Sequence, residues 1–292
     1  MATYNLTAAQ LRGTNGEGIL NSFEIPAGGG SSLLLDTYQN AAIAYSLRKL
    51  SSTFSGDPIR VRRSNDNAEQ DIPFDGNGDL DTTNLLAFVG SNDGFITKWY
   101  DQSGNSNDAY NTSATVQAKI VSSGTVETDD ANNKPTSVWD DVGYILTNTL
   151  TTTMEYYLIA TLRRSKALEI STLGRSTSNA PRILSWAANG SGNLYMSAMR
   201  GSVNFGSSAS QGTFIIETYR ESDGGMFLFR DQVQQGGHPT TSQAGGSLDK
   251  LDRWGQRSSV ESTGEYQEII LWPNDMFNNK ADIYTDLNTY YQ

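Results

Sequence analysis

The chain of 292 residues contains no cysteine and only one histidine, His238. Without cysteine it has no disulfides, no thiolate metal sites and no thiol catalysis. A zinc site is disfavoured, because a single histidine leaves only carboxylates as further ligands. The histidine lies in the sequence Gly236-Gly237-His238-Pro239, which is typical of a surface turn, so a Ser-His-Asp triad is the weaker interpretation.

Basic residues are also scarce. The formal net charge is -11, the sequence pI is about 4.5, and the densest basic stretches are 60–63 and Arg163-Arg164. Nucleic acid and anionic membranes are therefore disfavoured as partners. No apolar run approaches the roughly 20 residues of a membrane span. The sequence Met1-Ala-Thr-Tyr-Asn-Leu-Thr lacks the basic start and apolar stretch of a signal peptide, so we expect cytoplasmic synthesis without membrane insertion.

Glycine, tyrosine and small polar residues are abundant, whereas only 18% of the residues are charged. This composition is typical of an all-β, loop-rich domain. A break at 221–225 between two β-prone runs predicts a hairpin. The predicted short strands are 117–121, 136–139, 144–146, 154–163, 182–187, 194–199, 213–219, 226–230 and 266–271. Many short strands at such spacing predict a sandwich or jelly roll.

A few segments have other patterns. Residues 39–50 place Ile43, Leu47 and Leu50 at helical spacing, which predicts a helix. Residues 58–63 alternate apolar and basic side chains, which is typical of a strand with one solvent-exposed face. Two more helices are predicted, one over 81–90 between an aspartate cap and a glycine stop, and one over 278–291.

Residues 1–36 differ in composition from the rest, because they are polar and glycine-rich. Such a segment can bury little apolar surface by itself. We predict an N-terminal arm over 1–36 that attaches the protein to a neighbour, followed by one sandwich over 37–292. The alternative is a first strand and a surface loop of the same domain.

One stretch, Trp99 to Ala109, begins at the end of an apolar run and continues as a cluster of small polar residues. Aspartate, serine and asparagine side chains bond to their own backbone, and Gly104 supplies a positive φ. We interpret Asp101, Ser103, Asn105 and Asn107 as a structural turn, with Trp99 buried and Asp101 bonded to local backbone. An exposed Trp99 beside an unbonded Asp101 would instead indicate a binding site.

Three motifs in this order resemble the concanavalin A-like, laminin G or jelly-roll domains of bacteriophage virion proteins. They are Asn40-Ala-Ala-Ile-Ala-Tyr-Ser-Leu-Arg-Lys-Leu-Ser-Ser52, Ile59-Arg-Val-Arg-Arg-Ser-Asn-Asp-Asn-Ala-Glu-Gln-Asp-Ile72 and Trp99-Tyr-Asp-Gln-Ser-Gly-Asn-Ser-Asn-Asp-Ala109. A fourth stretch, Glu268-Ile-Ile-Leu-Trp272, precedes the terminal helix. The resemblance covers residues from about Leu33 to the end of the chain. It implies an all-β, concanavalin A-like jelly-roll sandwich with a few short helices.

The string 100–105 also resembles one in the catalytic domain of family 54 α-L-arabinofuranosidases. Those enzymes bind sugar over a vicinal Cys-Cys disulfide, which this chain lacks, and their catalytic Glu and Asp match no position here. A shared fold alone does not imply that this chain has the same activity. Glycoside hydrolysis needs two suitably spaced carboxyl groups. Glu261, Glu265 and Glu268 do not alternate as strand neighbours, and we expect Glu265 and Glu268 to face water.

Two interpretations stay open for the loop 75–81. Its oxygen-bearing side chains at alternate positions suit Ca²⁺, although the glycine and glutamate of an EF-hand are missing. A plain turn that caps the following helix is the alternative. The four candidate ligands are Asp75, Asn77, Asp79 and Asp81. No other cofactor is expected.

Sugar-binding sandwiches use exposed aromatic faces, and Trp186, Tyr195 and Trp254 are the candidates, although strand aromatics more often lie in the core. The resemblance to phage virion proteins implies a virion subunit, a head fibre, tail fibre, spike or decoration protein on the particle surface. We expect it to bind virion neighbours through 1–36, to bind a host-surface glycan, and to assemble as a homo-oligomer, with a trimer favoured. The alternatives are a glycoside hydrolase or depolymerase acting on envelope polysaccharide and a purely structural virion module.

Overall fold

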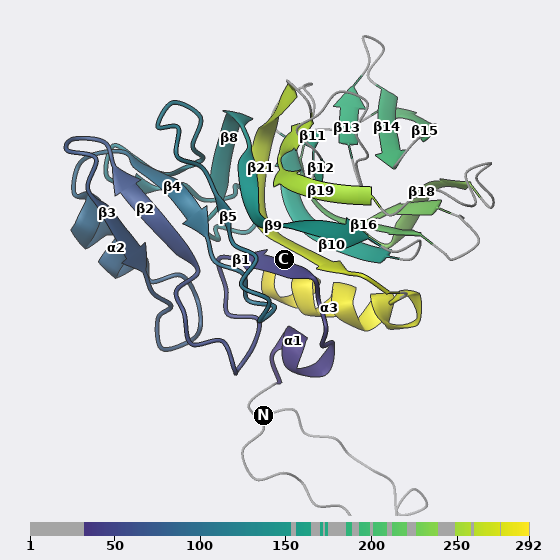
Figure 1. Cartoon of the computed structure of the whole chain (residues 1–292), viewed down its shortest axis with the longest axis horizontal. Helices are drawn as coiled ribbons and strands as arrows, with labels where there is room; N and C mark the ends of the chain where they lie inside the picture. The colour runs from purple at the N-terminus through teal and green to yellow at the C-terminus, as the bar shows by residue number, and fades with distance from the viewer. Residues whose placement is uncertain are drawn as a thin grey trace, which may run out of the picture. The chain divides into compact units, whose positions relative to one another are not determined.

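The fold is that of a concanavalin A-like β-sandwich with few helices (Figure 1). The computed structural model describes residues 32–152, 156–164, 170–171, 173–174, 185–188, 193–198, 201–208, 212–220, 226–238, 249–257, 260–274 and 276–291. Residues 1–31 of the predicted arm therefore lie outside the described residues. Among the described residues, no helix is long and apolar enough to cross a membrane.

One face of the sandwich is a series of antiparallel strands around β21. From edge to edge the order is β1 (Ile43–Ser46), β21 (Val260–Trp272), β10 (Tyr156–Arg164), β16 (Gly212–Arg220), β17 (Met226–Arg230) and β18 (Val233–His238). The predicted hairpin is confirmed, since β16 and β17 pair across the break at 221–225.

The second series of antiparallel strands packs over the first. It runs β3 (Glu69–Ile72), β2 (Ile59–Arg63), β4 (Gly94–Trp99), β5 (Ala109–Tyr110), β9 (Tyr144–Thr152), β19 (Asp249–Trp254) and β12 (Leu173–Gly174). Four further strands join this arrangement: β6 (Lys119–Ser122), β7 (Thr125–Val126), β8 (Ser137–Val142) and β20 (Gln256–Arg257). Because β8 pairs with both β6 and β21, it links the two series.

The remaining strands form a smaller sheet of β11 (Ile170–Ser171), β13 (Ser185–Ala188), β14 (Asn193–Ala198) and β15 (Gly201–Ser208). The helices are α1 (Leu34–Thr37), α2 (Thr82–Val89) and α3 (Lys280–Tyr291), with a 3-10 turn, η2 (Phe277–Asn279), before the last. Both α2 and α3 agree with the sequence prediction. Asp81 caps α2 by accepting a hydrogen bond from the Asn84 amide, and Gly90 ends it at φ 63°.

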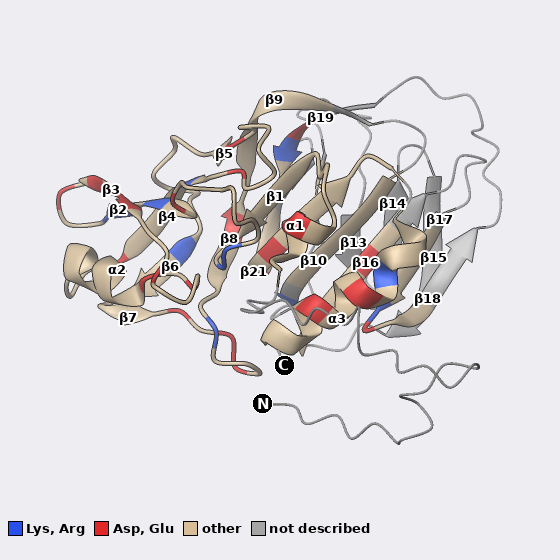
Figure 2. Cartoon of the chain, turned by 90° about the horizontal axis from the view of Figure 1, so that it is seen from below, with Lys and Arg blue, Asp and Glu red and all other residues tan. Residues whose placement is uncertain are grey.

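The sheet that contains β21 is buried on both faces. Successive strand residues point to opposite sides, so Leu158 of β10 joins the core between the two series of strands, whereas Ile159 joins a second core under α1 and α3. Seen from below, α3 lies across the outer face of β10 and β16 (Figure 2). Leu34 and Leu35 belong to the second core as well, so residues just before 37 pack with the sandwich.

The helix predicted over 39–50 is wrong, because its centre forms strand β1. All four residues of β1 are buried, since one face meets the inner core and the other meets the helices. A strand covered on both sides shows no alternation of apolar and polar residues. Its Ala-rich, continuously apolar sequence therefore resembled a buried helix.

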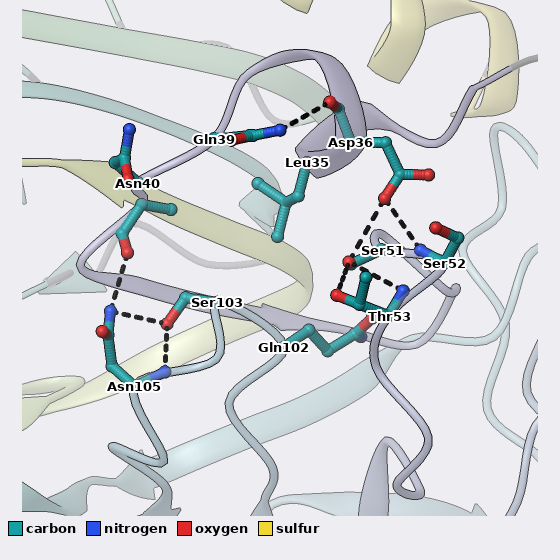
Figure 3. A pocket seen from close by; sticks show the side chains of 11 residues that line it. Leu35, Asp36, Gln39, Asn40, Ser51, Ser52, Thr53, Gln102, Ser103 and Asn105 are labelled. Atoms are coloured by element: carbon teal, nitrogen blue, oxygen red, sulfur yellow. Dashed lines mark hydrogen bonds between the residues drawn. The ribbon is translucent and has the colours of Figure 1, made fainter.

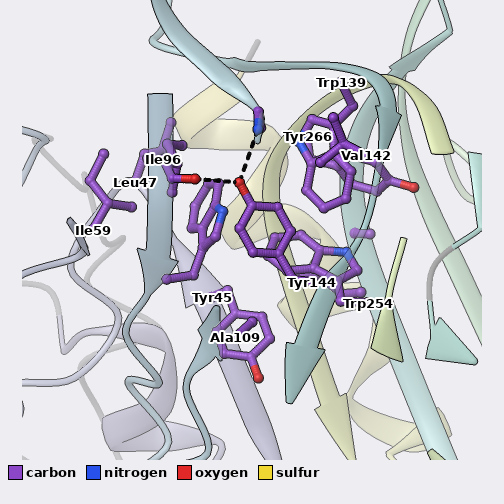
Figure 4. Packing of buried hydrophobic residues seen from close by; sticks show 14 of the residues in the cluster. Tyr45, Leu47, Ile59, Ile96, Ala109, Trp139, Val142, Tyr144, Trp254 and Tyr266 are labelled. Atoms are coloured by element: carbon purple, nitrogen blue, oxygen red, sulfur yellow. Dashed lines mark hydrogen bonds between the residues drawn. The ribbon is translucent and has the colours of Figure 1, made fainter. Parts of the chain in front are cut away.

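An aromatic cluster fills the inner core (Figure 4). Trp254 stacks on Tyr45 with ring centroids 5.0 Å apart, and it also contacts Trp99 and Trp139. Trp99 is fully buried, as predicted. Aromatic pairs at this spacing add about 0.5 to 1.5 kcal/mol beyond the area that they bury.

The turn that follows Trp99 is held by the carboxylate of Asp101. Its Oδ1 accepts hydrogen bonds from the amides of Ala44 and Ser103, and its Oδ2 accepts from the Asn107 amide at 3.0 Å. Asn105 donates to the carbonyl of Ala41 at 2.8 Å. The predicted structural turn is confirmed, and it also ties the chain to the start of β1.

A buried ion pair fixes α3 to the sheet. Arg48 Nε donates to Glu268 Oε2 at 2.8 Å, and the same guanidinium reaches Asp286 on α3. Ser46 and Tyr291 also donate to Glu268, so this fully buried carboxylate is well satisfied. Removing one partner of such a pair leaves the other charge buried and unpaired.

We therefore expect Glu268→Gln to lower the free energy of unfolding by about 3 kcal/mol, measured by urea denaturation. The double variant Arg48→Met with Glu268→Gln should recover most of that loss, because it removes the buried charge and keeps an amide oxygen that accepts from Ser46 and Tyr291. The matched control is Asp66→Asn, which breaks the solvent-exposed pair with Arg63 and should leave the midpoint almost unchanged. Equal losses in Glu268→Gln and Asp66→Asn would contradict this account.

Candidate functional site

Three polar side chains line up across neighbouring strands on the α3 side of the sheet. Arg163 of β10 lies opposite Glu265 of β21 on one side and opposite Thr213 of β16 on the other. Directly opposed residues of antiparallel strands share a face, so these side chains form one row. Arg163 Nη1 lies 3.6 Å from Glu265 Oε1.

The loop between β7 and β8 brings two aspartates to this row. Asp129 is buried and accepts a hydrogen bond from the Thr213 hydroxyl. The neighbouring Asp130 pairs with Arg163, and its side chain is 79% exposed. The loop is stabilised by a bond from the Ala131 amide to Asp129 Oδ1 at 2.8 Å. We call Glu265, Arg163, Asp129, Asp130 and Thr213 the acidic row.

Glu265 is electrostatically unusual. Its side chain is about one-tenth exposed, and burial raises its pKa to about 7. Asp129, Asp130 and Glu127 raise the pKa further, while Arg163 opposes them. A carboxyl group with a pKa near 7 is protonated in a substantial fraction at neutral pH, which suits a proton donor.

A small cavity of about 300 Å³ lies beside the acidic row, lined by Ala131, Thr161, Thr213, Phe214, Ile215 and Tyr291. Within the described residues, the buried Thr161 hydroxyl has no hydrogen-bond partner. Polar and apolar atoms both line this cavity, as in sites that hold small organic ligands.

The sequence interpretation missed the acidic row. Glu265 and Glu268 were expected to face water, but both are buried, because β21 is covered on both sides. The two carboxylates differ in their partners. Glu268 accepts hydrogen bonds from Ser46, Arg48 and Tyr291, whereas Glu265 makes an ion pair with Arg163 at 3.6 Å. Position 261 has no described side chain, so the structure says nothing of Glu261.

The predicted aromatic platform is wrong at Trp254, which is fully buried in the inner core and offers no face to a sugar. Trp186 and Tyr195 lie on β13 and β14, but their side chains are outside the described residues. His238, expected in a turn, lies at the end of β18 opposite Met226. Its side chain is likewise not described.

The structure uses the carboxylates of the loop 75–81 for other contacts. Asp75 accepts from the backbone amides of Asn77 and Asp79, and Asp79 accepts from the Tyr290 hydroxyl at 2.6 Å. Asp81 caps α2. Over the described ranges, no group of three or more His, Cys, Asp or Glu side chains could hold a metal ion. The turn interpretation therefore accounts for these residues.

A second, larger cavity of about 510 Å³ lies beside the turn after Trp99 (Figure 3). Its lining comes from residues 35–36, 39–41, 51–53, 102–103 and 105, which are nearly all neutral and polar. Among the lining residues, Asp36 carries the single charge. Burial opposes the ionisation of Asp36, but hydrogen bonds from Ser52 and Ser51 outweigh it and lower the pKa.

Comparison with known proteins finds similarity to α-L-arabinofuranosidases. The family model "Alpha-L-arabinofuranosidase B, catalytic" matches residues 36–157. A family 54 α-L-arabinofuranosidase soaked with a cyclic sulfate inhibitor aligns with TM-score 0.68 at 14% identity. An arabinofuranosidase complexed with arabinofuranosyl-α-1,2-xylobiose aligns with TM-score 0.65, also at 14% identity. Each alignment covers 88% of this chain and 64% of the other. No curated protein sequence matches the chain.

These matches correct the expected function. The matched family model describes an enzyme's catalytic domain, so the prediction of a phage virion protein without catalytic activity is wrong. The similarity to family 54 arabinofuranosidases, taken as the more distant one, is the similarity that the comparisons support. The sandwich fold itself was predicted and is shared with these structures.

The raised pKa of Glu265 predicts a pH effect on stability. The folded protein holds this proton more tightly than the unfolded chain, whose glutamate titrates near 4.5. The stabilisation is therefore complete below about pH 4.5 and is lost as the pH rises through about 7. Urea denaturation at pH 5 and pH 8 should show wild type losing stability relative to Glu265→Gln, which stays neutral at both. The same pH dependence in both proteins would rule out a raised pKa at Glu265.

Proposed function

We propose that this chain is a glycoside hydrolase that releases α-L-arabinofuranosyl groups from arabinose-containing polysaccharide. The observation that carries the proposal is Glu265, a carboxyl group with a pKa near 7 that shares the Arg163 guanidinium with the exposed Asp130. Glycosidases use one protonated and one ionised carboxyl group on either side of the scissile bond.

Three groups of the acidic row act on the reacting bond or orient the groups that do. Glu265 donates a proton to the oxygen of the leaving sugar as its bond to the anomeric carbon breaks, and Asp130 takes a proton from the water molecule that forms the new bond to that carbon. Both contact one guanidinium group, so their oxygens lie no farther apart than the roughly 9.5 Å that glycosidases use. Arg163 contacts both carboxyl groups and so orients them.

The neighbouring cavity supplies a place for the sugar. Thr161 and Thr213 offer hydroxyl groups there, and Phe214 offers an apolar surface. No disulfide can form in this chain, so the arabinose ring is held by these side chains rather than by a vicinal cysteine pair. The comparisons support arabinose as the sugar, since the matched family model and the aligned complexes are arabinofuranosidases.

The test compares two substrates with different leaving groups. Glu265→Gln should lower kcat on an arabinofuranosyl oligosaccharide by about 10²- to 10⁴-fold, because the departing sugar needs a proton. On 4-nitrophenyl α-L-arabinofuranoside the loss should be much smaller, since nitrophenolate leaves without protonation. The matched control, Glu69→Gln on β3, changes an exposed glutamate outside the acidic row and should leave both rates unchanged.

Two results would overturn the proposal. One is the absence of arabinose release by wild type from either substrate. The other is an equal loss of rate on both substrates in Glu265→Gln, which would mean that the residue does not protonate the leaving group.

A further inference from the structure

We infer that the larger cavity beside the turn after Trp99 binds a neutral saccharide, at a site separate from the acidic row. The cavity draws on residues between 35 and 105, whereas the acidic row draws on residues between 129 and 265, and no residue belongs to both. At about 510 Å³ it falls within the usual range for ligand pockets.

The floor of this cavity is rigid, because its polar groups are already bonded. Gln102 is buried, accepts a hydrogen bond from the Leu50 amide at 2.8 Å, and donates to the carbonyls of Ser46 and Arg48. Ser103 donates to Asp101 at 2.7 Å and accepts from the Asn105 side chain. A pocket with a fixed floor loses little conformational entropy when a ligand binds.

The rim, in contrast, carries polar groups with unused capacity. Asn40 is exposed, adopts a left-handed backbone with φ 64°, and its amide makes no hydrogen bond within the described part of the chain. Asp36 accepts through Oδ1 from the Ser52 amide at 2.9 Å and from the Ser51 hydroxyl at 3.3 Å, and an ionised carboxylate has further acceptor capacity. Gln39 donates to the Asp36 carbonyl, which leaves its own side-chain oxygen available.

The chemistry of the rim selects the ligand. Amide groups both donate and accept hydrogen bonds, and a carboxylate oxygen accepts from hydroxyl groups, so together they match neighbouring hydroxyls of a sugar ring. Leu35 adds an apolar contact for ring C–H groups, and Figure 3 shows it between Asp36 and the asparagine side of the pocket. No Lys or Arg lines the cavity, and the ionised Asp36 repels anions, so the pocket favours neutral sugars over phosphates and acidic sugars.

The experiment titrates wild type with arabinotriose and xylotetraose and follows side-chain amide signals in ¹⁵N NMR spectra. Gln39 and Asn40 should show saturable shifts with at least one of these neutral oligosaccharides, and trigalacturonic acid should produce none. Arabinose release is measured separately, so a failure of the proposed hydrolysis leaves this test standing.

Two variants locate the binding. Asn40→Gly removes the amide but keeps the left-handed backbone, and it should weaken binding about five- to tenfold. Ser52→Phe places a ring at the cavity wall and should abolish binding. The matched control is Asn67→Gly, another exposed left-handed asparagine, which should bind as wild type does. Both cavity variants should retain wild-type kcat on 4-nitrophenyl α-L-arabinofuranoside if the chain is a hydrolase.

The inference fails if no neutral oligosaccharide shifts the Gln39 and Asn40 signals, or if binding survives both cavity variants. It also fails if trigalacturonic acid binds better than the neutral oligosaccharides, because that result would contradict the charge of the pocket.

Discussion

Burial of β21 on both faces is the constraint on which the rest of the domain depends. Its inner face meets the aromatic core, and its outer face meets α1 and α3. A strand in this position must satisfy any polar side chain within the protein, because water cannot do so. Among its described side chains, the outer face carries two carboxyl groups, Glu265 and Glu268. The hydrogen bonds and ion pairs that each makes distinguish a structural carboxylate from the one with a proposed function.

Three carboxyl groups on the α3 side of the sheet, two on β21 and one on β16, illustrate the difference. Glu268 is met by Arg48 and two hydroxyl groups, which makes it a fixed anchor for α3. Glu217 accepts from Tyr157 at 2.6 Å, and burial raises its pKa, but it is fully buried in the strand that α3 covers. Glu265 alone combines partial exposure, a pKa near 7 and an exposed carboxylate across the same arginine.

The sequence was most informative where the signal is local. The turn after Trp99 follows from the hydrogen-bonding habits of aspartate and asparagine, and α2 follows from its aspartate cap and glycine stop, and both predictions are confirmed. The signal failed for β1, because burial on both faces removes the alternation that identifies a strand.

The acidic row could not be found in the sequence for a related reason. Its members come from the loop before β8 and from three strands, and only the pairing register places Arg163 between Glu265 and Thr213. Burial then creates the shifted pKa, and burial of a single glutamate depends on the whole sheet. A motif search centred on alternate carboxylates within one strand does not detect a site assembled across strands.

The sequence of the turn after Trp99 left open whether the turn is structural or binds a ligand. The structure separates these roles, because the inner side chains of the turn hold the backbone and its outer side borders the larger cavity. Both carboxylate oxygens of Asp101 accept hydrogen bonds from backbone amides of the turn and of β1, so this side chain is not available to bind a ligand. The same bonds hold Gln102 and Ser103 at the floor of the larger cavity. The inner polar groups of the turn are fully hydrogen-bonded, and they support a rim whose polar side chains still have free hydrogen-bonding capacity. A ligand at this rim can form hydrogen bonds without breaking existing ones.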